Sequence, residues 1–393
     1  MNVSNTHNCF GCGVCATVCA RDVIEIQLNK DGFYEPVFVN SKACTDCGLC
    51  VDVCSYQDKK LALPNTYLKS YGAWSRDASV RRKCSSGGVA FELGKFLISK
   101  GYKVCAVKYD ATRELALHYI ASNENELEES IGSKYIQSYT VGAFKAINRK
   151  EKYLVIGSPC QIDSFRRYIC KFKVEENFVL IDFFCHGVPS MFMWKKYLTE
   201  IKEKYNNVYK VVWRDKATGW HDSWSMNIYS TDNKLLLTSL FSKGDAFYRL
   251  FLGDGCLGYA CYDRCKFKYK NSSADIRIGD AWGTFYKDNE LGVNSVVSFT
   301  ERGDNVLKNS NIELQELPFD IVAESQMKKA PQRIKEYDEL MTSLRDFEQP
   351  LLNAMKIMDK HDVYVRLMYK INLIIHPFQT FKRISRRISI KNR

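Results

Sequence analysis

The sequence predicts an α/β protein in which a small cysteine-rich module precedes a larger domain built on a parallel sheet. Two observations predict the module: eight of the sixteen cysteines fall within the first 54 residues, and alternating apolar residues lie between them. A third predicts the larger domain, because short apolar strands alternate with helices further along the chain. We place the module at residues 1–62, the larger domain at 63–345 and a helical, basic tail at 346–393.

The composition is that of an ordinary globular protein. Hydrophobic residues make up 46% of the 393 residues and charged residues 26%. No apolar run approaches the roughly 18 residues that a membrane span needs, and no signal-peptide pattern opens the sequence. We therefore expect a cytoplasmic protein whose cysteines serve as thiolate ligands and do not form disulfides.

The cysteines of the module form two runs with the spacing C-x2-C-x2-C-x3-C. In the bacterial ferredoxin pattern three cysteines of a run hold one 4Fe-4S cluster and the fourth crosses to the other cluster. This crossed pattern assigns one cluster to Cys9, Cys12, Cys15 and Cys54, and the second to Cys19, Cys44, Cys47 and Cys50. Zinc and disulfides are the alternatives, but zinc sites use paired C-x2-C units and such close cysteines could pair only with strain. The module is therefore predicted to move single electrons.

A β-hairpin is predicted between the two runs. Residues 23–28 and 34–39 alternate in polarity around the turn-forming segment 29–32.

The larger domain contains strands at about 103–109, 153–156 and 178–184, with helices between them. In such sheets the ligand crevice lies at the carboxyl ends of the strands. The segment Ser85-Ser-Gly-Gly88 precedes a helix that reaches about residue 100. Free amide groups at the start of a helix can bind a phosphate. The alternative is that the segment is an ordinary N-cap that binds no ligand.

A third cluster is predicted in this domain. Cys256, Cys261 and Cys265 have the spacing C-x4-C-x3-C and are one ligand short of a cluster. Cys185 or Cys160, at the predicted sheet edge, could supply that ligand, and zinc or unligated thiols are the alternatives. Alternating residues from 208 to 241 predict an antiparallel excursion before these cysteines.

The tail carries half of the formal net charge of +12. Its last dozen residues supply six positive charges and no acid, and apolar residues recur at helical spacing from Phe378 to Ile388. This pattern is typical of a helix lying on anionic lipid, at the inner face of the membrane, and a solvated tail is the alternative. No nucleic-acid-binding motif accompanies the charge, so we expect no nucleic-acid partner.

Several ordered motifs resemble the coenzyme F420 (deazaflavin) hydrogenase/dehydrogenase beta-subunit family. The resemblance covers residues 5–300 and rests, besides the cysteine runs, on the segments 85–88, 132–138, 157–161, 185–190 and 275–283, and on Cys261 and Cys265. It implies an α/β flavoprotein that carries FAD and an iron–sulfur cluster and acts on a deazaflavin or another conjugated substrate. Bacterial members of this arrangement often accompany exopolysaccharide synthesis genes. The family's closing cysteine pair is commonly C-x2-C, whereas Cys261 and Cys265 are C-x3-C.

The resemblance also implies roles for particular residues. Those expected to bind FAD are Ser86, Gly87 and Gly88 at the pyrophosphate, Ser133, Lys134, Tyr135 and Gln137 along the flavin, and Asp275 and Asp280. Together with the cysteine spacing it implies that Cys185, Cys256, Cys261 and Cys265 hold the third cluster. Cys160 and His186 are the candidate catalytic proton donors.

These inferences meet on one function. Ferredoxin or a partner subunit would feed electrons through the 4Fe-4S clusters to FAD, which would reduce a small-molecule electron acceptor. Two alternatives remain: an electron-transfer subunit that has no substrate site of its own, and a redox scaffold at the membrane surface.

Overall fold

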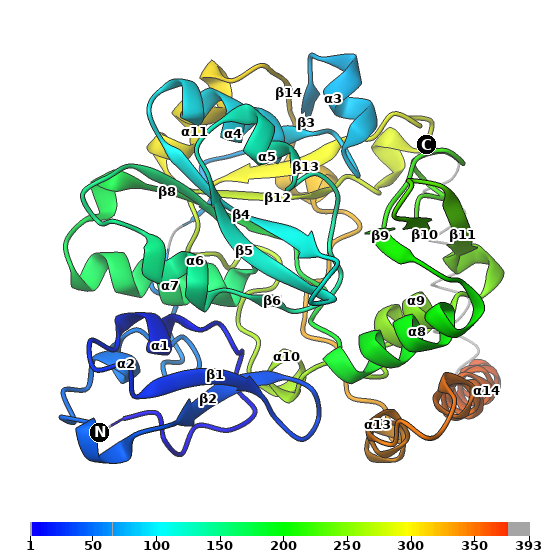
Figure 1. Cartoon of the computed structure of the whole chain (residues 1–393). Coiled ribbons are helices and arrows are strands. Elements are labelled where there is room, and N and C mark those ends of the chain that lie inside the picture. The colour runs from blue at the N-terminus through cyan, green and yellow to red at the C-terminus, as the bar shows by residue number, and fades with distance from the viewer. Residues whose placement is uncertain (1, 65, 376–393) are drawn as a thin grey trace.

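A nine-stranded mixed sheet forms the centre of the protein (Figure 1). The structure is a computed structural model that describes residues 2–64 and 66–375. In spatial order the strands are β14 (Ile312–Glu316), β3 (Lys69–Ser75), β13 (Asn294–Ser298), β12 (Ile276–Asp280), β8 (Phe178–Phe183), β7 (Tyr153–Ile156), β4 (Lys103–Asp110), β5 (Leu115–Ala121) and β6 (Ser138–Tyr139).

Only part of this sheet is parallel. Strands β4, β7, β8 and β12 run parallel to their neighbours in the centre, and β6 pairs parallel to β5 at one edge. Antiparallel pairs join β5 to β4 on one side, and β13, β3 and β14 on the other. The prediction of a parallel sheet is therefore correct for the centre and wrong for the flanks. Where no helix intervenes between successive strands, as between β4 and β5, the chain returns antiparallel.

Helices cover both faces of the sheet because successive side chains in its central strands point in opposite directions. Leu154 and Val179 pack toward α4 (Val89–Ser99), α5 (Glu124–Glu128) and α11 (Glu301–Asn309). Their neighbours Tyr153 and Leu180 pack toward α6 (Val141–Ala146) and α7 (Pro159–Lys171). Figure 1 shows these two helical layers above and below the sheet.

The N-terminal module lies against the face covered by α6 and α7 (Figure 1). It consists of α1 (Val14–Val18), β1 (Ile24–Leu28), β2 (Tyr34–Phe38), the 3-10 turn η1 (Ser41–Ala43) and α2 (Leu49–Asp52). Strands β1 and β2 pair antiparallel with Leu28 opposite Tyr34, which confirms the predicted hairpin. Apolar side chains of α1 and of α7 share one buried cluster, so the module and the large domain form a continuous core.

A second core lies beside the sheet. Strands β9 (Val208–Val212), β10 (Ser225–Ser230) and β11 (Leu235–Leu240) form an antiparallel sheet, which confirms the predicted excursion. Buried Trp194 and Trp213 pack there with the helices α8 (Met191–Lys204), α9 (Ala246–Leu252), α13 (Tyr337–Arg345) and α14 (Leu351–Ile375). The remaining short elements are α3 (Ala78–Lys83), α10 (Tyr259–Asp263), α12 (Phe319–Val322), η2 (Glu175–Asn177), η3 (Phe241–Lys243) and η4 (Thr284–Tyr286).

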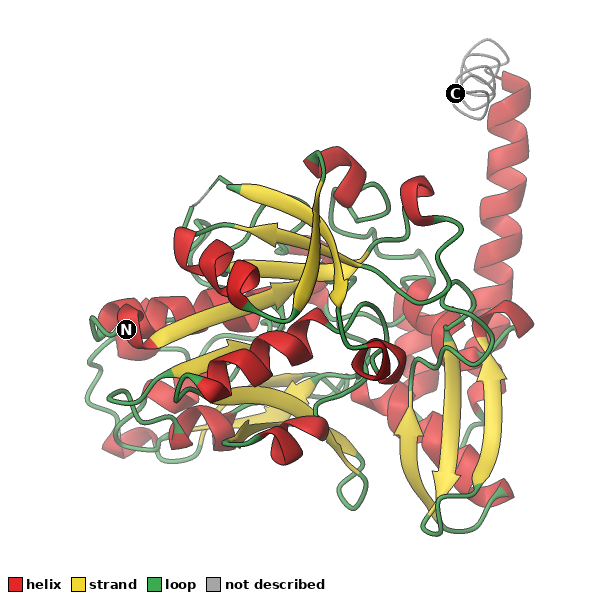
Figure 2. Cartoon of the chain, turned by 90° about the horizontal axis from the view of Figure 1, so that it is seen from above, coloured by secondary structure: helices red, strands yellow, loops and turns green. Residues whose placement is uncertain are grey.

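Helix α14 lies within the segment predicted as a tail, and its two halves differ. In the first half Leu351, Ala354, Met355 and Met358 are buried in the second core. The second half projects from the body of the protein (Figure 2). The predicted lipid-binding segment that starts at Phe378 lies outside the described residues.

None of the helices in the described part of the chain has the length and apolar character that crossing a membrane requires.

A buried ion pair joins the two central strands β8 and β12. Both carboxylate oxygens of Asp182 accept hydrogen bonds from Arg277, at 2.7 and 2.6 Å, and both side chains are fully buried. The third nitrogen of the guanidinium group donates to the carbonyls of Phe267 and Tyr269. One arginine therefore fixes the sheet centre and the loop that follows Cys265.

Replacing Arg277 with methionine should destabilise the protein by about 3–5 kcal/mol, because the Asp182 carboxylate would remain buried without its partner. Urea unfolding of the anaerobically purified chain measures this loss. The control is Arg76→Met, which breaks the exposed pair with Glu313 and should change stability little. Equal stability of the two variants would contradict the assigned role of Arg277.

Candidate functional site

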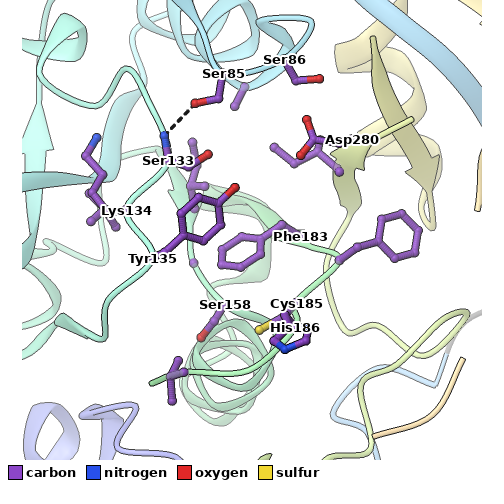
Figure 3. A pocket seen from close by; sticks show the side chains of 18 of the residues that line it. Ser85, Ser86, Ser133, Lys134, Tyr135, Ser158, Phe183, Cys185, His186 and Asp280 are labelled. Carbon is purple, nitrogen blue, oxygen red and sulfur yellow. Dashed lines mark hydrogen bonds between the residues drawn. The ribbon is translucent and has the colours of Figure 1, made fainter. Parts of the chain in front are cut away.

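A cavity of about 470 Å³ opens at the carboxyl ends of the central parallel strands. Its walls come from the loops that follow β7 and β8, from the end of β12, from the start of α4 and from residues 130–138. The second core contributes Trp224 and Phe251. Ligands of open α/β sheets bind at this position, so the cavity is the candidate site (Figure 3).

One end of the cavity is formed by the start of α4. Gly88 precedes the helix with a positive φ of 85°, a conformation that favours glycine, and as the N-cap residue it has no side chain to bond the first amides. Asn294 Oδ1 accepts the Val89 N–H at 3.2 Å, so one of these amides is already paired. Ser85 Oγ accepts a hydrogen bond of 2.9 Å from the backbone N–H of Ser133, which holds the opposite wall (Figure 3). The partial positive charge at the start of this 11-residue helix therefore faces the cavity and suits an anionic group.

The predicted pyrophosphate residues divide between the cavity and the sheet. Ser86 and Gly88 line the cavity, but the Ser86 hydroxyl already donates to the Val293 carbonyl at 2.9 Å. Gly87 does not line the cavity. A Cβ at Gly87 would lie 2.5 Å from the Ala73 carbonyl oxygen, so this glycine allows the loop to pack on the sheet.

Aromatic rings form the middle of the cavity wall. The ring of Tyr135 lies 4.9 Å from that of Trp224 and 5.6 Å from that of Phe251, measured between centroids. Phe183, at the end of β8, is 36% exposed although it lies inside the fold, and it faces the cavity (Figure 3). An exposed aromatic ring inside a protein offers its face to a ligand, and a planar conjugated ring fits this wall.

A buried arginine that the sequence analysis did not identify organises this wall. The Arg214 guanidinium donates to Asp280 at 2.9 Å and to the Tyr135 hydroxyl at 3.2 Å. It lies between the rings of Trp224 and Trp282, at 4.8 and 4.9 Å from their centroids. Asp280 therefore lines the cavity, as predicted, but as the partner of Arg214. Arg214 belongs to no spacing motif. The feature of the sequence that could have identified it is an arginine in a segment rich in tryptophan.

Lys134 does not point into the cavity. Its ammonium group donates to the carbonyls of Ser130 and Ile131, at 2.8 and 3.1 Å, beyond the end of α5. Figure 3 shows the side chain directed away from Tyr135. Burial lowers the pKa of Lys134 to about 7. The predicted contact of this lysine with a flavin ring is therefore corrected to a contact with the backbone.

Two other predicted cofactor ligands have structural contacts. Gln137 accepts a hydrogen bond from the Tyr34 backbone N–H at 3.0 Å and donates to the Phe10 carbonyl, so it fastens the N-terminal module to the cavity wall. Asp275 is buried away from the cavity. It accepts hydrogen bonds from Arg166 at 2.9 Å and from the Leu180 N–H at 2.7 Å. Its charge is satisfied inside the sheet and not by a cofactor.

Within the module, the cysteines that influence one another electrostatically are Cys9, Cys12, Cys15 and Cys54, and separately Cys19, Cys47 and Cys50. Burial raises the pKa of Cys9, and the nearby Cys12 and Cys54 thiols raise it further. The pKa of Cys15 is raised by burial and by the same two thiols. In the second group, burial raises the pKa of Cys50, and the nearby Cys47 and Cys19 thiols raise this pKa further. Cys44 follows η1 beside Asn2. Such thiols lose their protons when iron binds.

A third group of cysteines lies between the module and the cavity. Burial raises the pKa of Cys160 well above its usual value, and Cys185 and Cys261 raise it further. The pKa of Cys261 in turn is raised to about 12 by burial, with contributions from Cys185 and Cys265. Cys160, Cys185 and Cys261 therefore lie within electrostatic reach of one another, and Cys265 lies within such reach of Cys261.

Cys256 lies elsewhere. Its thiol is directed toward the Leu250 carbonyl, at 3.8 Å, and the residue is fully buried in the second core beside Leu257. The structure thus places Cys160 where Cys256 was expected. Cys160 is in the first turn of α7 and does not line the cavity, so the proton-donor role predicted for it does not fit its position.

Among the described residues, no group of three or more His, Cys, Asp or Glu side chains has the spacing to hold a metal ion.

Lys268 provides a test of whether this third group suits an anionic cluster. It is 8% exposed, and its ammonium group donates to the carbonyls of Cys185 and His186 at 2.5 and 2.9 Å. It forms no ion pair with an acidic side chain of the described residues. A buried cation is costly without an anionic partner. A cluster with four thiolate ligands carries negative charge, and the Lys268 position therefore fits it.

The three cysteine groups follow one another toward the cavity. Ser164, on the same helix as Cys160, contacts the Cys12 thiol at 3.3 Å and accepts the Ser55 N–H at 3.1 Å. Cys12 also acts electrostatically on Cys160. At the other end Cys185 precedes His186, which lines the cavity and whose Nε2 lies 2.8 Å from Asp254 Oδ1. His186 is therefore the candidate proton donor that the structure does place at the cavity.

Comparisons with known proteins find two matching families, one in each part of the chain. Residues 150–318 match the family described as the C terminus of the coenzyme F420 hydrogenase/dehydrogenase beta subunit, and residues 8–57 match the 4Fe-4S dicluster domain. None of the curated proteins matches the chain. A chain in a solved structure of the F420-reducing NiFe hydrogenase complex from Methanosarcina barkeri is 17% identical, with a TM-score of 0.46. That comparison covers 78% of this chain and 93% of the other.

Substituting serine for Cys160 should remove the third cluster, whereas the same change at Cys256 should not. Anaerobic iron analysis is expected to give about twelve irons per chain for the unaltered protein and for Cys256→Ser, and about eight for Cys160→Ser. The reverse result, with iron lost only from Cys256→Ser, would contradict the assignment of Cys160.

Proposed function

We propose that the protein is an iron–sulfur flavoprotein oxidoreductase. The starting point is that residues 150–318 match the C terminus of the coenzyme F420 hydrogenase/dehydrogenase beta subunit and residues 8–57 match the 4Fe-4S dicluster domain. The observation that carries the proposal is the succession of three cysteine groups that ends at an aromatic-walled cavity. Electrons would enter from ferredoxin or a partner subunit and would leave to a small organic acceptor, a deazaflavin or another conjugated compound.

The chain's residues would divide the work as follows. The module's eight cysteines would hold two clusters, and Cys160, Cys185, Cys261 and Cys265 would hold the third. The start of α4 with Ser85 and Gly88 would bind the pyrophosphate of FAD, because its amide groups face the cavity. Phe183 and Tyr135 would pack on the ring system. Bound there, FAD would supply the conversion between one-electron and two-electron transfer.

The protein also has to supply a proton and exclude water. His186, held beside Asp254, lies in the cavity wall next to Cys185 and could hold a proton there. Trp224, Trp282 and Phe251 surround the same space with apolar surface, which keeps water from the reacting atoms. The link to exopolysaccharide synthesis stays a prediction, since no contact in the described residues bears on it.

Flavin binding tests the proposal. In the anaerobically purified chain we expect flavin absorption together with the iron–sulfur bands. Phe183→Asp should lower the flavin content at least about tenfold, because it removes an apolar ring contact from the cavity wall and adds a negative charge. Phe183 is already 36% exposed, so its replacement leaves the packed core intact. Flavin and iron per chain are the measurements.

The matched control is Phe241→Asp, at a residue 39% exposed and outside the cavity, which should leave the flavin content unchanged. A chain that holds about twelve irons and takes up no flavin on reconstitution would overturn the flavoprotein proposal. It would favour an electron-transfer subunit without its own substrate site.

A further inference from the structure

The second half of α14 has the chemistry of a membrane-binding element. Every residue from 363 to 371 is exposed, in contrast to the first half of the helix, where five apolar side chains are buried in the second core: Leu351, Ala354, Met355, Ile357 and Met358. Figure 2 shows that this half leaves the body of the protein and extends away from it. The exposed apolar side chains include Val363, Val365, Leu367, Met368, Tyr369 and Ile371.

The distribution of these side chains around the helix indicates what covers them. At about 100° per residue, the apolar side chains from Val363 to Ile371 span about 240° of the circumference. A helix that packs on a protein surface needs an apolar stripe of only about 100°. The much wider arc fits insertion among lipid chains better than docking on the surface of a partner protein.

The charges of this half complete the pattern. Arg366 and Lys370, one turn apart, occupy the remaining arc, and both are exposed. The nearest acids of the helix, Asp359 and Asp362, are already paired with Arg249 at 2.8 Å. Beyond Asp362 the sequence contains eight Lys and Arg residues and no Asp or Glu. A surface of this charge is complementary to anionic lipid headgroups.

We propose that the second half of α14, from Val365 onward, binds the surface of an anionic membrane and holds the protein there. Its apolar arc lies among the acyl chains, and Arg366 and Lys370 reach the headgroups. Tyr364, at the base of this half, contacts the body, because its hydroxyl accepts a hydrogen bond from Lys335 at 2.7 Å. The body of the protein is thereby held close to the lipid, whether or not the cavity binds flavin.

Vesicle flotation of the full, anaerobically purified chain tests the proposal. The protein should float with vesicles of phosphatidylcholine mixed equally with phosphatidylglycerol and should bind vesicles of phosphatidylcholine alone more weakly. Leu367→Asp should reduce binding by about tenfold or more, because it removes a leucine from the apolar arc and adds an acid. The double variant Arg366→Glu, Lys370→Glu should also lose at least about tenfold, and the loss should shrink in high salt.

The control is Lys356→Glu, which makes half of that charge change on the half of the helix that packs on the body and should leave binding nearly unchanged. A chain ended after Ile375 should bind more weakly than the full chain, and its remaining binding should still depend on Leu367. The proposal is overturned if the full chain ignores anionic vesicles or if Leu367→Asp binds them as well as the unaltered protein does. It is also overturned if the unaltered protein is a dimer in solution that Leu367→Asp converts to a monomer, since a second copy would then be the occupant.

Discussion

The buried pair of Arg277 and Asp182 is the interaction on which the arrangement of the site depends. It joins β8 and β12, and the same guanidinium group binds the carbonyls of Phe267 and Tyr269. Cys185 follows β8 directly, and Cys265 precedes the loop that Arg277 holds. Two cysteines that are distant in sequence are thereby brought to one place by a contact that contains no sulfur.

Helix α7 performs the corresponding task on the other side. Its first turn carries Cys160, and Ser164 one turn later contacts Cys12 of the N-terminal module. Asp163 on the same helix accepts hydrogen bonds from Ala62 N–H and from Ser273, so it ties the connecting segment to the loop that leads into β12. The order of the cysteine groups is therefore set by one helix and one ion pair.

The sequence predicted those features that depend on local spacing and missed those that depend on tertiary contact. The two cysteine runs, the hairpin and the Ser-Ser-Gly-Gly helix start are local patterns: the runs match a 4Fe-4S dicluster domain, and the hairpin and the helix start lie where they were expected. The choice between Cys160 and Cys256 depends on how α7 and α10 approach β8, which no spacing encodes. Lys134 and Asp275 likewise have the residue types of ligands, but carbonyl groups and Arg166 already occupy their polar atoms. The sequence analysis did not identify Arg214 and Lys268, because an isolated Arg or Lys residue forms no recognisable motif.

The contacts that hold the N-terminal module on the large domain have a consequence for the rate of electron transfer between them. Gln137 clamps it through Phe10 and Tyr34, Thr140 donates to the Cys12 carbonyl, and Ser190 donates to the Asp31 carbonyl at the hairpin turn. A module held at so many points cannot swing between docking positions, as mobile carrier domains do. Electron transfer from the module to the large domain, or in the reverse direction, would then cross a constant distance. Its rate would depend on the driving force and the reorganisation energy, and not on domain motion.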